Sequence, residues 1–476
     1  MDRYENYQSP LVARNASAAM CRLFGPRKRI RTWRQLWVAL ADAQRRQGLA
    51  ISKRQVDSLR RAIDDIDFRA AAAYERKMRH DVMAHVHAFG DRAPQARGIL
   101  HLGATSAYVT DNADLIIMRD ALRLIRDWLV NVIDALARFA KEHRALPTLG
   151  LTHGQPAQVT TVGKRAVLWC YDFVRDLEEI ETRLDRLSFR GVKGATGTQA
   201  TFLDLFDGDH DKVLALEADV AGQFAFKRIE PVTGQTYSRK VDAQIIGALA
   251  GVASSVHKMC NDLRLLAATK EIEEPFERSQ VGSSAMAYKR NPMRCERATA
   301  LARFVLALPS SALQTHAEQW FERTLDDSAI RRLTIPESFL ATDGMLRIML
   351  NVARGLVVYP KVIAQRLDAE LPFMTTEAIL MAGVQAGGDR QKLHEKIRRH
   401  SQAAARRVKE DGAPNDLLDR LTNDSAFAKI DIRRTASAKR FIGRSPQQVD
   451  AFLKDIVTPL RRRYRSSLGM DAELSV

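Results

Sequence analysis

The sequence contains three long runs in which apolar residues recur at alternating steps of three and four positions. This spacing places the apolar side chains along one face of a helix and is typical of helices that pack in bundles or coiled coils. The apolar positions are Leu115, Met118, Leu122, Ile125, Leu129, Val132, Leu136 and Phe139 in the first run, Val167, Tyr171, Val174, Leu177, Ile180, Leu184 and Leu187 in the second, and Leu249, Val252, Val256, Met259, Leu263 and Leu266 in the third. An apolar face on a helix of roughly 25 residues or more needs several partner helices to cover it.

No alternation of strands with helices and no convincing two-residue periodicity interrupts these runs, which disfavours a parallel sheet. We therefore predict an all-α protein built on a central bundle of long helices. A chain of 476 residues normally divides into several domains. We predict an N-terminal helical domain over residues 1–105, the long-helix bundle over 106–358, and a C-terminal helical domain over 359–476.

Three segments rich in turn-forming residues separate the predicted helices, at 146–156, 190–199 and 271–292. The third is long, has a weak helical pattern, and includes Pro275, Gly282 and Pro292. Long segments without regular structure inside compact proteins are usually functional loops or lids. We predict such a loop here.

The formal net charge of +17 is compatible with a nucleic-acid binder or with a polyanionic small substrate. The only dense basic cluster is Arg461, Arg462, Arg463 and Arg465, and no stacking aromatics interleave with the basic runs, so we expect a small anionic ligand and no nucleic acid. No apolar run approaches the roughly 18 residues that span a bilayer. Together with a polar N-terminus, this predicts a cytoplasmic protein without a membrane partner. Four widely spaced cysteines predict neither a disulfide framework nor a zinc site.

The most informative stretch is Gly-Ser-Ser-Ala-Met-Ala-Tyr-Lys-Arg-Asn-Pro at residues 282–292. By residue types alone, an ordinary surface loop is an equally good interpretation. The stretch resembles the signature loop of the fumarase/aspartase superfamily, whose members eliminate fumarate or a close analogue from a substituted succinate. Six further segments resemble, more narrowly, the adenylosuccinate lyase family: RHDVMAH at 79–85, HLGATS at 101–106, THGQPAQ at 152–158, GVKG at 191–194, GQTY at 234–237 and WFERTLDDS at 320–328.

The resemblance runs over residues 9–460 and is greatest to the animal form of the family. It implies elimination of fumarate from adenylosuccinate, giving AMP, and from SAICAR, giving AICAR, in purine nucleotide biosynthesis. It also implies a homotetramer whose active sites each draw residues from three subunits, with no metal and no cofactor.

The chemistry requires a base, an acid on the opposite face, and groups that hold negative charge as it develops. The resemblance implies that His153 is the general acid, and an imidazole suits this role because it titrates near neutral pH. It implies that Ser283 is the general base. A serine hydroxyl is a very weak acid, so we expect Lys289 and backbone amides to stabilise its alkoxide. The resemblance further implies that His80 assists near the reacting centre and that Glu296 orients His153.

The same resemblance implies a set of substrate-binding residues. They are Arg14, Asn15, Arg79, His80, Asp81, Thr105, Ser106, Gln235, Arg297, Arg323, Ser328 and Arg332. Guanidinium groups suit phosphate and carboxylate because they donate two parallel, charge-assisted hydrogen bonds. The chain departs from the family at Asn15, which replaces a tyrosine, at Gly154, which replaces a bulky aromatic, and at Ala287, which replaces a proline. At Asn15 the side chain that helps hold the nucleotide in the animal form is missing, which puts that contact in question. The changes at Gly154 and Ala287 remove no chemical group, and we expect them to loosen positioning.

Other readings of the sequence remain. The spacing of His80, His85 and His87 is compatible with a metal site, although no cluster of Cys or acidic ligands accompanies these residues. The same fold also serves argininosuccinate lyase, fumarase and aspartase, and it can serve as a purely structural protein. A basic helical nucleic-acid binder is the fourth hypothesis, but the sequence has no groove-reading motif.

Overall fold

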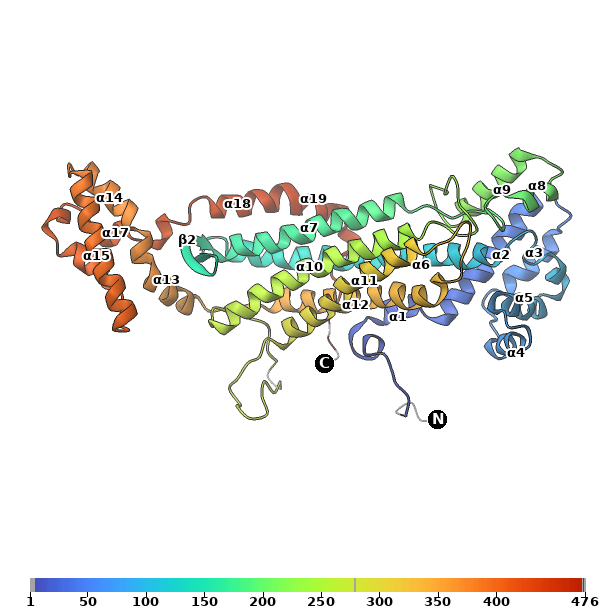
Figure 1. Cartoon of the computed structure of the whole chain (residues 1–476), viewed down its shortest axis with the longest axis horizontal. Coiled ribbons are helices and arrows are strands. Elements are labelled where there is room, and N and C mark those ends of the chain that lie inside the picture. Colours follow the sequence, from blue (N-terminus) through green and yellow to red (C-terminus); the bar gives the residue numbers. More distant parts are fainter. Residues whose placement is uncertain (1–4, 278–279, 473, 475–476) are drawn as a thin grey trace.

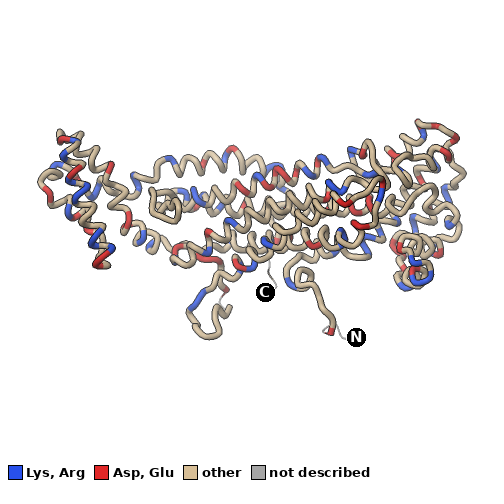
Figure 2. Tube along the Cα trace, viewed as in Figure 1, with Lys and Arg blue, Asp and Glu red and all other residues tan. Residues whose placement is uncertain are grey.

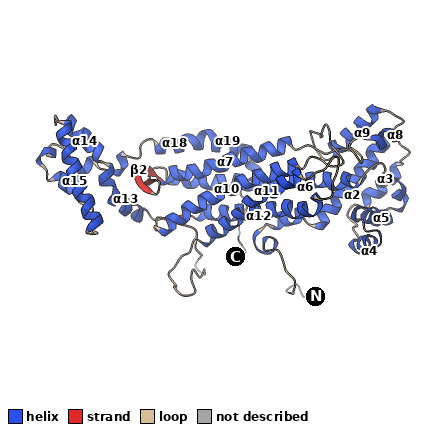
Figure 3. Cartoon of the chain, viewed as in Figure 1, coloured by secondary structure: helices blue, strands red, loops and turns tan. Residues whose placement is uncertain are grey.

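The computed structural model describes residues 5–277, 280–472 and 474. Within these residues helices dominate, and the strands form two short antiparallel pairs (Figure 3). The molecule is elongated, with its long helices running along the long axis (Figure 1). The predicted all-α fold is confirmed.

Five long helices form the central bundle and pack against one another. They are α6 (Ser106–Glu142), α7 (Val162–Arg186), α10 (Lys240–Ala268), α11 (Met293–Ala317) and α12 (Asp327–Gly355). The three predicted apolar faces lie in α6, α7 and α10, and nearly all of their residues are buried. Tyr171 is the clear exception, because its ring is exposed and packs against Phe452 and the guanidinium of Arg175.

Shorter helices cover the two ends of the bundle (Figure 1). One end carries α1 (Ala18–Leu23), α2 (Pro26–Arg46), α3 (Lys53–Arg61), α4 (Phe68–Met78), α5 (Asp81–Arg92), α8 (Ala200–Leu205) and α9 (His210–Gln223). The other end carries α13 (Pro360–Met374), α14 (Thr376–Gln385), α15 (Arg390–Glu410), α16 (Leu417–Thr422) and α17 (Ile432–Thr435). The chain then returns along the bundle through α18 (Ser445–Phe452) and α19 (Thr458–Arg463), which contact α7 and α6 respectively.

The segment at 146–156, predicted only as a break between helices, instead forms most of a β-hairpin. Strands β1 (Pro147–Thr152) and β2 (Gln155–Thr161) pair antiparallel, and His153 and Gly154 make the turn. Both turn residues have positive φ, +56° and +73°, which is the signature of a two-residue type I′ turn. Glycine adopts this conformation without strain, and histidine is among the residues that tolerate it best. The turn thus gives a physical reason for glycine at position 154.

A second pair joins β3 (Ile272–Glu273) to β4 (Val357–Val358). It ties the beginning of the predicted loop to the end of α12. The described residues between Glu274 and Pro292 contain no helix or strand, as the sequence predicted.

Lysine and arginine are interspersed with acidic residues over the whole length of the molecule (Figure 2). The positive excess therefore belongs to the general surface. In residues 5–277, 280–472 and 474, no helix combines the length and the apolar character that a membrane span requires.

The buried face of α6 supplies a test of the bundle. Leu129 is fully buried in the main core, so we expect Leu129→Ala to lower the free energy of unfolding by about 2–5 kcal/mol, measured by urea denaturation. Leu214→Ala is the matched control, because Leu214 is exposed on α9 and its loss is expected to cost less than about 0.5 kcal/mol. Equal effects of the two substitutions would contradict the assigned core.

Candidate active site

A cavity of about 530 Å³ lies at the end of the bundle where α5, α6 and α12 begin. Residues from the first turns of all three helices line it: Asp81 and Val82 from α5, Ser106 and Ala107 from α6, and Asp327 and Ser328 from α12. A helix N-terminus presents free backbone N–H groups and the positive end of the helix dipole. Three such termini around one cavity make it a site for an anion, and a phosphate group fits this chemistry.

The junction of α4 and α5 places two of the predicted residues in the cavity. Arg79 ends α4 in the left-handed conformation with φ +57°, and His80 then caps α5. His80 Nδ1 accepts a hydrogen bond from the backbone N–H of Met83 at 3.3 Å, so the neutral ring carries its proton on Nε2. That nitrogen lies 3.4 Å from Ser106 Oγ, which joins α5 to the start of α6.

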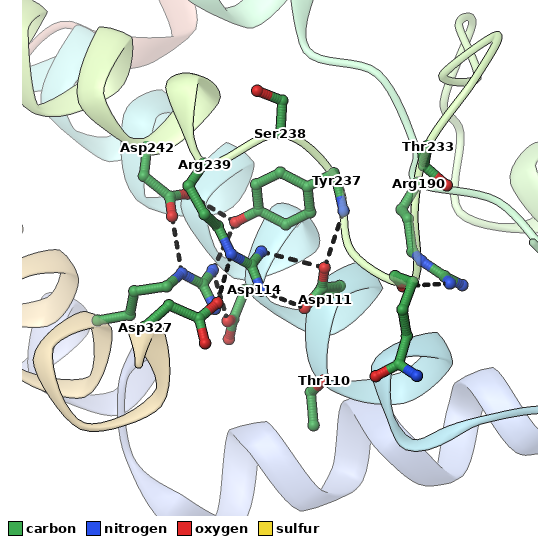
Figure 4. Close-up of polar contacts among 12 residues, drawn as sticks. Thr110, Asp111, Asp114, Arg190, Thr233, Tyr237, Ser238, Arg239, Asp242 and Asp327 are labelled. Atoms are coloured by element: carbon green, nitrogen blue, oxygen red, sulfur yellow. Dashed lines mark hydrogen bonds and ion pairs between the residues drawn. The ribbon is translucent and has the colours of Figure 1, made fainter. Parts of the chain in front are cut away.

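A layer of buried ion pairs forms the base of the cavity (Figure 4). The guanidinium of Arg239 binds both carboxylate oxygens of Asp111 at 3.0 and 3.2 Å, and its Nε donates to Asp327 at 2.6 Å. Burial lowers the pKa of Arg239, but the attraction of Asp111 and its neighbours more than offsets this, so the pKa lies above its usual range. The cation is therefore permanent.

A second buried arginine lies beside the first. Arg331 donates to Asp242 at 2.7 Å and to the hydroxyl of Tyr237 at 2.5 Å, and it pairs with Asp114 at 3.0 Å. Burial lowers the pKa of Arg331, but the neighbouring carboxylates raise it by more. The pKa of Arg331 therefore lies above its usual range. The neighbouring Arg332 is instead more than half exposed and pairs with Asp81 at 3.1 Å. Of these adjacent arginines, Arg332 has the freedom to bind a ligand.

The cavity brings together eight of the predicted site residues. They are Arg79, His80, Asp81, Ser106, Gln235, Arg323, Ser328 and Arg332. Thr105 lies next to them as the N-cap of α6, and its buried Oγ1 has no hydrogen-bond partner among the described residues. Gln235 is held by its side-chain amide, which donates to the carbonyl of Ala195 at 3.1 Å.

Other residues of the cavity were not identified from the sequence. They are Arg29, Trp33, Glu75, Asp111, Asp114, Arg239, Asp327 and, as a lining residue, Arg331. One signal could have indicated two of them, because Asp111 and Asp114 lie three positions apart near the start of a helix whose other face is apolar.

The predicted general acid lies outside this cavity. His153 is exposed at the tip of the β1–β2 hairpin, at the opposite end of the bundle from α5 (Figure 1). Helix α6 alone, with 37 residues, separates the two ends by about 55 Å. Glu296 is exposed in the first turn of α11, and the structure shows no contact between it and His153 within one chain.

The predicted base lies on the loop before α11. Ser283 Oγ accepts hydrogen bonds from the backbone N–H groups of Ala285 at 3.3 Å and Met286 at 3.1 Å. Two amide donors on one oxygen favour its negatively charged form. The loop is narrow at its base, because a Cβ on Gly282 would lie 1.9 Å from the carbonyl oxygen of Lys289. Asn291 Nδ2 closes the base by donating to the carbonyl of Gly282 at 2.9 Å.

The remaining predicted residues lie in two further places. Arg14 and Asn15 belong to a short π-helical turn, Leu11–Asn15, that packs on α12, where the Arg347 side chain donates to the carbonyl of Asn15 at 2.9 Å. The Asn15 side chain itself donates to the carbonyl of Pro10. Arg297 lies in the second turn of α11, close in sequence to the signature loop.

The three histidines that suggested a metal site have different surroundings. His80 caps α5, His85 packs edge-on against Trp33 and Phe68, and His87 stacks on Tyr74. Partial burial lowers the pKa of His85 to about 4, so this ring is neutral near pH 7. The GVKG motif also has a structural role, since Lys193 forms a buried ion pair with Glu217 at 2.9 Å.

Comparison with known proteins agrees with this architecture. Two family profiles match: one described as lyase over residues 43–306 and one described as adenylosuccinate lyase C-terminus over residues 372–452. The solved structure of a fumarate lyase from Mesorhizobium sp. BNC1 superimposes with a TM-score of 0.78 at 26% identity, covering 92% of this chain and 98% of that one. The long-helix bundle is thus the fold of a fumarase/aspartase-type lyase.

Closer relatives narrow the assignment. The chain is 52% identical to adenylosuccinate lyase of Saccharomyces cerevisiae over 97% of both proteins. It is 45% identical to adenylosuccinate lyase of Schistosoma mansoni over the full length of both. The chain belongs to the adenylosuccinate lyase family, which confirms the family predicted from the sequence motifs.

One partly buried histidine, His101, generates a prediction about how stability depends on pH. Burial lowers the pKa of His101 to about 4, and its Nδ1 accepts a hydrogen bond from Trp37 Nε1 at 2.9 Å. An unfolded histidine takes up its proton near pH 6.5, so the stability contributed by neutral His101 is present above pH 6.5 and is lost as pH falls to about 4. The loss is on the order of 3 kcal/mol.

We expect His101→Asn, which cannot titrate and tolerates the positive φ of this position, to flatten the decline in unfolding free energy between pH 6.5 and 4. Urea denaturation at a series of pH values measures this slope. A variant with the same slope as the unmodified protein would show that His101 does not titrate as assigned.

Proposed function

We propose that this chain cleaves adenylosuccinate to AMP and fumarate, and SAICAR to AICAR and fumarate, in purine nucleotide biosynthesis. The observation that carries the proposal is the cavity, because three helix N-termini and several arginines surround the residues that match the family's nucleotide-binding motifs. Full-length identity to relatives named adenylosuccinate lyase supports the choice of substrate.

In the proposed mechanism, the Ser283 alkoxide removes a proton from the succinyl carbon next to a carboxylate. The resulting aci-carboxylate dianion then expels the nitrogen that carried the succinyl group, the exocyclic amino nitrogen of AMP or the carboxamide nitrogen of AICAR, and this nitrogen takes a proton from His153 as the C–N bond breaks. The two amide donors on Ser283 Oγ support the first step, because they stabilise the alkoxide before it reacts. Products are fumarate and the free amine, and both catalytic groups then exchange protons with water.

We further propose a homotetramer in which three subunits complete each site. One chain cannot unite His80 with His153, since α6 holds them about 55 Å apart. The loop supports the same conclusion, because its apolar side chains Val281, Met286 and Tyr288 are largely exposed and need a covering surface. Leu168 of α7, Leu265 of α10 and Leu313 of α11 are likewise exposed on the bundle helices. We propose a cytoplasmic location for this assembly.

The shared site predicts complementation. We expect Ser283→Ala and His153→Ala each to abolish fumarate release while leaving the oligomer folded, because both residues lie outside the helical core. When the two inactive proteins are unfolded together and reassembled in equal amounts, about a quarter of the sites will pair an intact serine with an intact histidine from different chains.

Fumarate absorbance measures the recovered activity, with each variant reassembled alone as the control. If the mixture regained no fumarate-releasing activity, this result would contradict the sharing of Ser283 and His153 between subunits. Argininosuccinate and malate, offered in place of adenylosuccinate, test the substrate class.

The narrow base of the loop gives a second prediction. Gly282→Ala would place a methyl group against the carbonyl of Lys289, so the loop must open and Ser283 must move. We expect a fall in kcat of about 100-fold or more. Gly222→Ala is the matched control, because no atom lies within 4 Å of the added carbon, and its kcat is expected to stay unchanged. Full activity of Gly282→Ala would contradict the placement of the base on this loop.

A further inference from the structure

Asp327 lies where the buried core meets the cavity. It is the first residue of α12, its side chain is 1% exposed, and it lines the cavity. Its Oδ2 atom accepts from Arg239 Nε at 2.6 Å and from Arg323 Nη1 at 3.2 Å. The carboxylate therefore joins a buried arginine to a more exposed one.

The buried side of this connection is rigid. Arg239 is 1% exposed and is held by the two-pronged contact with Asp111 of α6, and its guanidinium also stacks over the ring of Tyr237 (Figure 4). Asp111 accepts from the backbone N–H of Tyr237 as well, at 3.1 Å. Helix α6 thus holds Arg239 in place through Asp111, and Arg239 in turn holds the carboxylate of Asp327.

The exposed side of the connection is Arg323. About a quarter of the Arg323 side-chain surface is exposed to solvent. Arg323 lies in the irregular segment before α12 and lines the cavity. An unrestrained arginine loses considerable rotamer freedom when it binds an anion. An arginine already held by a fixed carboxylate has lost part of that freedom in advance.

We propose that Asp327 is a positioning residue that orients the guanidinium of Arg323 toward the nucleotide. This inference rests on the proposed function, because it takes the cavity as the nucleotide site. Asp327 acts through Arg323 and does not enter the reaction itself. Arg323 lines the same cavity as the N-termini of α5, α6 and α12, which suit a phosphate group, and the phosphate is a part of the substrate that does not react.

The proposal predicts that loss of Asp327 changes KM much more than kcat. Loss of binding to a non-reacting group raises KM and leaves kcat nearly unchanged. We expect Asp327→Asn, which keeps the shape and removes the charge, to raise KM for adenylosuccinate about tenfold and to weaken AMP binding equally, with kcat within about threefold of the parent.

A double-mutant cycle with Arg323→Gln tests whether Asp327 acts through Arg323. In the Arg323→Gln background, Asp327→Asn is expected to change KM less than about twofold, because the side chain that it orients is already gone. Equal fold-changes in both backgrounds would overturn the proposal. Asp343→Asn is the matched control, since Asp343 is a fully buried carboxylate on the same helix that binds Ser17 and Trp128; its effect on KM is expected to be small.

If Asp327→Asn does not assemble, Asp327→Glu replaces it in the cycle, because it keeps the negative charge among the arginines and shifts the carboxylate oxygen that accepts from Arg323. A small change of KM in the Arg323→Gln background again supports the proposal, and equal fold-changes in both backgrounds overturn it. A parent protein that releases no fumarate from adenylosuccinate would refute the proposed function, whereas an active parent with additive substitutions would refute only the role of Asp327.

Discussion

The length of helix α6 is the constraint on which the rest of the site depends. Its 37 residues form one uninterrupted helix of about 55 Å, buried on several sides by α7, α12 and α2. The anion cavity lies at its first residue and the His153 hairpin follows its last. A rod of this length cannot bend to bring its ends together. A chemical role that needs both ends of this helix cannot be filled within one chain.

The buried charges at the cavity show how a rigid core is extended into a polar site. Arg239 and Arg331 pair with Asp111, Asp114, Asp242 and Asp327, and burying a charged group without partners is costly. The network unites α6, α10, α12 and the segment before α10. It therefore fixes the N-termini of α6 and α12 relative to each other, and these are two of the three helix N-termini around the cavity.

Local sequence pattern predicted the parts of the structure that local physics determines. Residues 115–139 had to become one helix, because their three-and-four spacing has no other simple interpretation, and the apolar positions are buried in α6. The β1–β2 hairpin was missed, since a type I′ turn at His153 and Gly154 depends on two φ angles that the residue names alone do not reveal. Asp327 and Arg239 were missed for another reason: they are 88 positions apart, and no pattern within a window indicates that they pair. Residues such as Arg323 and Ser328 were found through family motifs, and residue periodicity would not have identified them.

The return of the chain along the bundle has a consequence for synthesis on the ribosome. Val449, Leu453 and Val457 belong to the main core, and Asn131 in the middle of α6 binds the backbone of Ser467 and Gly469. A nascent chain that already contains α6 and α7 still lacks the segment that covers this part of their surface. Synthesis of this late segment must therefore precede completion of the core. Until then the partly made protein carries an uncovered apolar strip, which is the kind of surface that molecular chaperones bind.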